Sequence, residues 1–99
     1  MTIDEAKNGE MIQLNVHGKV DANSSTQLQT EVLKSFQKCP SVILNFADVS
    51  YISSAGLRAL LIGQKTASSK GGKFLIINAN EAVVEVLRVT GLQKVLSVQ

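Results

Sequence analysis

Two adjacent serines, Ser53 and Ser54, occupy the position in this chain that best suits a chemical modification. They follow an apolar run at residues 42–46 and stand just before a helical pattern that begins at about residue 54. Open α/β sheets place functional loops at the carboxyl ends of their strands. A serine there can accept a phosphoryl group, or it can simply cap the helix that follows. Position alone leaves both interpretations open.

The usual parts of a catalytic centre are scarce. The only imidazole, His17, lies at the end of a predicted strand with nothing to place it near a serine, so we expect a partly exposed structural histidine. The only cysteine, Cys39, stands beside Pro40 at a helix end and is expected to pack. Residues 70–73 are glycine-rich but lack the spacing of a phosphate-binding loop. The sequence therefore predicts a protein that is not an enzyme and that holds no metal or cofactor.

Charge and hydropathy narrow the class of partner. Ten basic and eight acidic residues give a net charge of +2 and are scattered, so nucleic acid is not an expected partner. The longest apolar runs are of strand length, well short of the ~20 residues of a membrane span, and the first ten residues lack the apolar core of a signal peptide. A single cysteine fits a reducing compartment. We expect a cytoplasmic protein that does not insert into membranes.

Five segments are predicted to be strands. Ile12, Leu14 and Val16 alternate with polar residues, as in a half-buried strand, and residues 2–6 could pair with it through a turn at residues 8–9. Residues 42–46 form a nearly continuous apolar run, typical of a central strand covered on both faces. Further strands are predicted at residues 74–77 and 95–98.

Three helices are predicted between these strands. The first begins at a capping box formed by Ser24 and Gln27 and ends before Pro40. The second runs from about residue 54 to 69, after a loop at residues 48–54, and the third begins at a cap on Asn80. The order β-β-α-β-α-β-α-β predicts an α/β fold with a mixed, largely parallel sheet and an N-terminal hairpin. We expect one domain over residues 1–99.

The segment around the serines carries a family resemblance. Residues 48–57 read Asp-Val-Ser-Tyr-Ile-Ser-Ser-Ala-Gly-Leu, which resembles the signature of STAS domains of the anti-sigma factor antagonist family. The residues that fit the pattern are Asp48, Ser50, Tyr51, Ile52, Ser54, Ala55, Gly56 and Leu57. Residues 18–21, 70–72 and 81–92 resemble other parts of the family, so the likeness covers essentially the whole chain.

The resemblance implies a STAS fold and a phosphorylation switch. The family's phosphorylated serine falls on Ser54, while Ser53 stands where many members carry aspartate and is the second candidate. In the family, the unphosphorylated antagonist binds an ATP-binding serine-kinase anti-sigma factor and frees the sigma factor. The kinase phosphorylates the antagonist, and a metal-dependent serine phosphatase restores it.

The resemblance also implies which residues meet the partner. They are Asp21, Asp48, Ser50, Tyr51, Ile52, Ser53, Ala55, Gly56, Leu57 and Arg58. Asp21 and Asp48 could flank the loop as an acidic pair, or each could make ordinary turn hydrogen bonds. Arg58 could be a partner contact or a solvated residue of the helix's first turn.

A second function would use the same fold. Some STAS domains are regulatory subunits of membrane transporter ATPases and act without phosphorylation. The hydroxyl at Ser54 favours the antagonist over this alternative.

Overall fold

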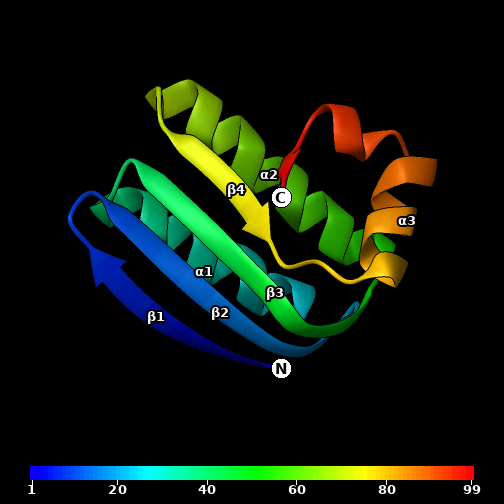
Figure 1. The fold of residues 1–99 in the computed structure, drawn as a ribbon. Helices are drawn as coiled ribbons and strands as arrows, with labels where there is room; N and C mark the ends of the chain where they lie inside the picture. The colour runs from blue at the N-terminus through cyan, green and yellow to red at the C-terminus, as the bar shows by residue number, and fades with distance from the viewer.

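The computed structural model describes residues 1–99, and the elements follow one another in the predicted order (Figure 1). They are β1 (Thr2–Asn8), β2 (Met11–Val20), α1 (Ser25–Lys38), β3 (Ser41–Ile52), α2 (Ser54–Lys70), β4 (Lys73–Ile77), α3 (Glu81–Val89), the 3-10 helix η1 (Leu92–Lys94) and β5 (Ser97–Val98).

All five strands form one sheet, in the order β1-β2-β3-β4-β5. β1 is antiparallel to β2, to which it is joined by a tight turn with Gly9 at φ 64°, and every later strand is parallel to its neighbour. The predicted α/β fold, with a mixed, largely parallel sheet and an opening hairpin, is therefore confirmed.

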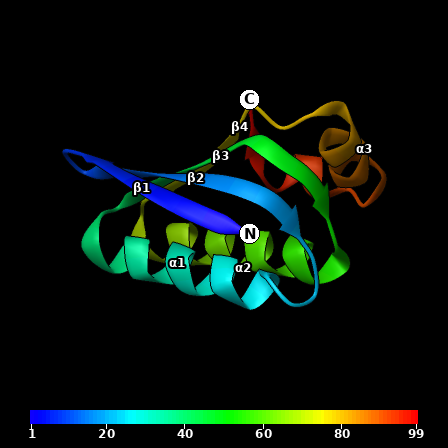
Figure 2. The same cartoon turned by 90° about the horizontal axis from the view of Figure 1, so that it is seen from below.

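Helices α1 and α2 cover one face of the sheet. Helix α3 lies apart from this layer, beyond the carboxyl ends of the parallel strands (Figure 2). The covered face carries the core, because alternate residues of β2 and β3 are almost fully buried. The alternating buried residues are Ile12, Leu14, Val16, Val42, Leu44 and Phe46, and Val20, Val49 and Ile52 are buried farther along the same strands.

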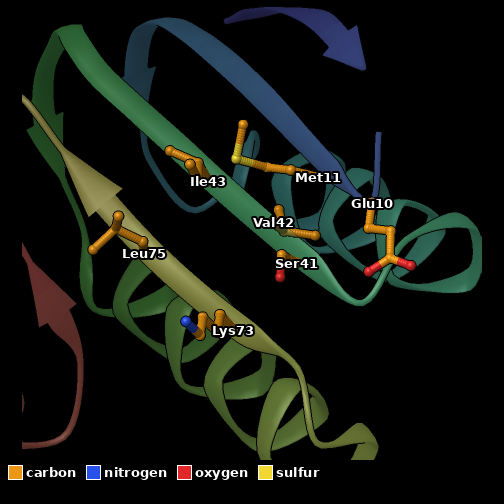
Figure 3. Close-up of a pocket in the computed structure, with 7 residues that line it drawn as sticks. All are labelled: Glu10, Met11, Ser41, Val42, Ile43, Lys73 and Leu75. Atoms are coloured by element: carbon orange, nitrogen blue, oxygen red, sulfur yellow. The ribbon is translucent and has the colours of Figure 1, made fainter. Parts of the chain in front are cut away.

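The opposite face of the sheet is open, so the prediction that residues 42–46 are covered on both faces was wrong. Ile43 makes the run look continuous, but its side chain lies on the open face and is only half-buried. It lines a shallow hollow of about 310 Å³ together with Met11 and Leu75 from the flanking strands (Figure 3). Neighbouring apolar side chains, and not a second layer of helices, thus partly cover Ile43.

β3 is longer than predicted, and the expected loop at residues 48–54 was wrong. The strand continues to Ile52, where it pairs with Val20. Its register with β2 shifts twice, between Asn15 and His17 and again between Gly18 and Lys19. At each shift β3 carries one more residue than β2, as in a β-bulge, and bulges hide the alternation by which a strand is recognised.

The capping box predicted at the start of α1 was also wrong. Ser24 is the N-cap residue, but its side chain makes no capping hydrogen bond, and its backbone is already helical, with φ −90° and ψ −14°. Its hydroxyl instead donates to the Lys19 carbonyl at 2.8 Å and accepts from the Asp21 N–H at 2.9 Å. The cap on Asn80 is confirmed, because its side chain accepts from the Val83 N–H at 2.8 Å.

Candidate functional site

Ser53 is the structural serine of the pair. It is the single residue between β3 and α2, and its extended backbone, with ψ 173°, turns the chain into the helix. Its side-chain oxygen accepts a hydrogen bond from the Gly56 N–H at 3.2 Å, which is the N-cap interaction. Its own N–H donates to the Val20 carbonyl at 2.8 Å. The hydroxyl is therefore engaged in holding the first turn of α2.

Ser54 is the exposed serine of the pair. It is the first residue of α2, and its hydroxyl makes no hydrogen bond within the chain. The first N–H groups of a helix lack intrahelical partners, and the helix dipole favours a negative charge there. Ser54 thus combines an accessible nucleophilic oxygen with a backbone that suits an anion.

Gly56 brings α2 close to the sheet. A Cβ at this position would lie 2.7 Å from the Cγ1 atom of Ile52 and 2.8 Å from the Cγ1 atom of Val20, closer than real side chains approach. Leu57 and Ile52 are buried, with 8% and 4% of their surfaces exposed. These three residues of the predicted partner-binding set therefore lie in the interior, where they fix the position of the serines.

Around the two serines the exposed side chains are those of Ser50, Tyr51, Ser54 and Arg58, with Ala55 half-buried among them. Tyr51 is 51% exposed although it is a large, partly apolar side chain. It shares a small hollow of about 50 Å³ with residues of α3, among them Val86. The surface that a partner could touch here carries hydroxyl groups, one aromatic ring and one guanidinium.

Asp21 forms a turn with its own neighbours. Its Oδ1 atom accepts from the N–H groups of Ser24 at 2.9 Å and Asn23 at 3.0 Å. The bond from the Ser24 N–H is the largest cause of a pKa below the ordinary value for this carboxyl. The residue follows Val20, whose carbonyl binds Ser53, so the turn lies next to the start of α2.

Asp48 lies farther back along the sheet. It pairs with His17 on β2, and its carboxylate contacts the Nδ1 atom of that histidine at 2.7 Å. His17 precedes Asp21 by four residues, a distance of about 13 Å along a strand. The structure therefore gives the two aspartates separate partners instead of joining them as a pair.

The rest of the chain offers less chemistry. The hollow on the open face is lined by Glu10, Met11, Ser41, Val42, Ile43, Lys73 and Leu75 and includes no residue of the 48–57 segment (Figure 3). Cys39 is buried as a free thiol. The chain has no group of three or more acidic, histidine or cysteine residues placed to hold a metal ion. None of its helices has the length and apolar character needed to cross a membrane.

Comparison with known proteins identifies the family. The sequence model of the STAS domain matches residues 2–99, nearly the entire chain. The chain belongs to the STAS domain family. This STAS domain is 24% identical over 98 residues to the anti-sigma-B factor antagonist of Bacillus subtilis (strain 168), with 99% of the chain and 90% of the relative covered.

Solved structures share the fold of this STAS domain. A Thermotoga maritima protein provisionally identified as an anti-sigma factor antagonist superposes with a TM-score of 0.90 at 21% identity, over 97% of this chain and 84% of that one. The Bacillus cell fate determinant SpoIIAA, in its phosphorylated form, superposes with a TM-score of 0.77 at 18% identity, over 99% and 91%. At these identities the likeness establishes the fold.

One cluster was missed by reasoning from the sequence. His17 contacts Asp4 of β1 as well as Asp48 of β3, and so joins three strands. The contact with Asp4 could have been predicted in part from the hairpin turn. If Asn8 pairs with Met11, Thr2 lies opposite His17, and Asp4 is two residues from Thr2. The approach of Asp48 depends on the β2–β3 register, which the bulges shift.

Proposed function

We propose that this STAS domain is an anti-sigma factor antagonist whose binding is switched off by phosphorylation of Ser54. The observation that carries the proposal is the contrast between the two serines: the Ser53 hydroxyl is engaged as a helix cap, whereas the Ser54 hydroxyl is exposed and unbonded at the helix start. The name of the Bacillus subtilis relative and the phosphorylated form of SpoIIAA support it.

In this proposal the unphosphorylated domain binds an ATP-binding serine-kinase anti-sigma factor in the cytoplasm and so releases a sigma factor. The kinase transfers the γ-phosphoryl group of ATP to the Ser54 oxygen, the hydroxyl proton is lost and ADP leaves. A metal-dependent serine phosphatase later transfers that phosphoryl group to water. The domain itself, residues 1–99, catalyses neither step and acts as a single binding unit.

The phosphate should be tolerated by the fold and rejected by the interface. It adds roughly 1.5 to 2 negative charges where the free N–H groups of α2 favour an anion. The neighbouring Tyr51 and Ala55 side chains are aromatic and small, so an interface closed over them would leave the new charge without a partner. An unpaired buried charge costs roughly 3 to 5 kcal/mol, or on the order of 10² to 10³ or more in affinity.

The partner-binding residues divide by exposure. Ser50, Tyr51, Ser54 and Arg58 are exposed and would meet the kinase directly, with the half-buried Ser53 and Ala55 between them. The buried Ile52, Gly56 and Leu57 would act by holding this surface in place. Asp21 and Asp48 would bound the surface at two separate points.

Mass spectrometry of the protein purified from its own cells tests the proposal. We expect one phosphoryl increment that peptide mapping locates on Ser54, that is lost in Ser54→Ala and that persists in the matched control Ser53→Ala. A protein that carries no phosphoryl group on Ser54 under any growth condition would contradict the proposal. Co-purification with a transporter ATPase in place of a serine kinase would favour the role of a transporter subunit.

A further inference from the structure

His17 lies between two carboxylates on the open face of the sheet. Its Nδ1 atom is 2.7 Å from Oδ2 of Asp48 on β3, and its Nε2 atom is 3.1 Å from Oδ2 of Asp4 on β1. The imidazole side chain is 37% exposed, and the two carboxylates are more exposed still. Three neighbouring strands thus contribute one group each to a chain of contacts.

The geometry determines the charge of the ring. A neutral imidazole has one N–H donor and one bare nitrogen, and an ionised carboxylate can only accept. Contact of both nitrogens with carboxylates therefore requires the imidazolium, with two N–H donors and a positive charge between two negative ones. The hydrogen bonds to Asp48 and, second, to Asp4 accordingly raise the pKa of His17 above its ordinary 6.5.

No other charged group is among the ring's partners. Asp4 is its charged partner on β1, and Asp48 is its charged partner on β3. On β2 the preceding residue of the same face is Asn15, an uncharged amide that bonds Gln13 and Asn45. The next charged residue of β2 is Lys19, which lies beyond the second register shift.

We propose that His17 is a positioning residue that, as an imidazolium, holds the Asp48 carboxylate and ties the edge strand β1 to the start of the 48–57 segment. When the ring loses one proton, a single N–H donor remains. The contact with Asp48 is the shorter of the two, so the remaining proton stays on that side and Asp4 is released first. The bridge stands on the geometry alone. Its effect on partner binding rests on the proposed function, in which Asp48 bounds the contact surface.

β1 is the element most sensitive to this release. It pairs only with β2, and all its side chains except Ile3 are exposed. Apart from Asp4, the only other ion pair of the strand joins Glu5 to Lys38 of α1 at 3.6 Å. Since the folded pKa of His17 is raised, the contact is fully present below pH 6.5 and is lost as the pH rises through the folded value.

An NMR titration tests the bridge, and His17 is the only histidine, so its ring signals are unambiguous. We expect a His17 pKa above 6.5, lowered more by Asp48→Asn than by Asp4→Asn and unchanged in the matched control Glu5→Gln. The carboxyl carbon signal of Asp48 should shift over the same pH range as the ring signals of His17, because the charge of the ring changes beside it. A pKa at or below 6.5, or one that neither asparagine variant lowers, overturns the bridge.

Amide exchange of β1 provides the second readout. After correction for the intrinsic pH dependence, exchange at residues 2–8 should speed up as the pH rises through the His17 pKa, and this step should vanish in His17→Gln. A step that persists in His17→Gln overturns the link to β1. Neither measurement depends on phosphorylation. If the bridge is confirmed but the protein is never phosphorylated, the proposed function is rejected and the bridge is not.

Discussion

Replacing Ser53 by alanine should destabilise the fold, whereas the same replacement at Ser54 should not. The Ser53→Ala variant loses the side-chain acceptor of the Gly56 N–H, a bond of 3.2 Å at the start of α2. Loss of a serine N-cap costs about 1 kcal/mol, within a range of about 0.5 to 2 kcal/mol. In a domain of this size that loss lowers the melting temperature by roughly 4 to 8 °C.

Ser54→Ala serves as the matched control, because it removes the same hydroxyl one residue later. Ser54 makes no side-chain hydrogen bond and already has helical geometry, so the exchange gains only the slightly better helix propensity of alanine, a few tenths of a kcal/mol. The two variants should thus differ by about 1 kcal/mol in the free energy of unfolding. Urea unfolding followed by circular dichroism measures that difference, provided that the slope m is the same for both.

A third variant separates the cap from the hydroxyl itself. Ser53→Asp keeps a side-chain acceptor at the N-cap and adds a negative charge at the helix start, so it should recover the stability lost in Ser53→Ala. The reasoning fails if Ser54→Ala is as unstable as Ser53→Ala. It fails equally if Ser53→Asp remains as unstable as the alanine variant.

Three further outcomes are expected from the same region. Gly56→Ala places a methyl group 2.7 Å from Ile52 and should destabilise the fold, because overpacking costs about 1 to 3 kcal/mol and the gain in helix propensity is about 1 kcal/mol. A melting temperature at or above that of the parent protein would contradict this expectation. Asn80→Ala loses both the cap on α3 and the hydrogen bond that the Asn80 Nδ2 atom donates to the Val49 carbonyl at 2.9 Å. Its loss of unfolding free energy, measured with urea, should be about 2 kcal/mol and exceed that of Ser53→Ala, and Asn80→Asp should be intermediate. The pKa of the Asp21 carboxyl is lowered from its ordinary 3.8, so the ionised group stabilises the fold above pH 3.8 and loses this effect as the pH falls through the lowered pKa. Asp21→Asn should therefore flatten the acid limb of the curve of stability against pH. An unchanged acid limb would argue against the turn.

The sequence predicted those parts of the structure that depend on local pattern. Alternation in β2, the glycine at the end of α2 and the asparagine before α3 each act through a few neighbouring residues, and each was found where expected. The position of the two serines, after a strand and at a helix start, also follows from local pattern. The hydrogen bond to the Gly56 N–H and the difference in exposure distinguish the cap from the exposed hydroxyl, and both depend on how the backbone enters α2.

The loop predicted at residues 48–54 and the missed His17 bridge share a different cause, which is the register between strands distant in sequence. The bulges of β3 arise only against β2, so residues 48–52 read as a loop when considered alone. The capping box at Ser24 failed for a local reason: the chain bends at Asp21, and the Ser24 hydroxyl bonds the Lys19 carbonyl instead of the helix. The His17 bridge needs β1, β2 and β3 in place together, and no spacing along the chain indicates it.

The spatial order of the strands equals their order in the chain, and this has a consequence for how the sheet is assembled. Every strand after the first pairs with the strand that precedes it in sequence, so each addition closes a loop that contains no more than one α-helix, with the short η1 as well before β5. For parallel strands this order keeps the closed loops short, because paired strands are also consecutive in the chain, and it limits the chain entropy lost at each step. As the ribosome releases the chain from its N-terminus, β3 can bind the finished β1–β2 hairpin before β4 emerges, which limits the time that any strand edge stands bare.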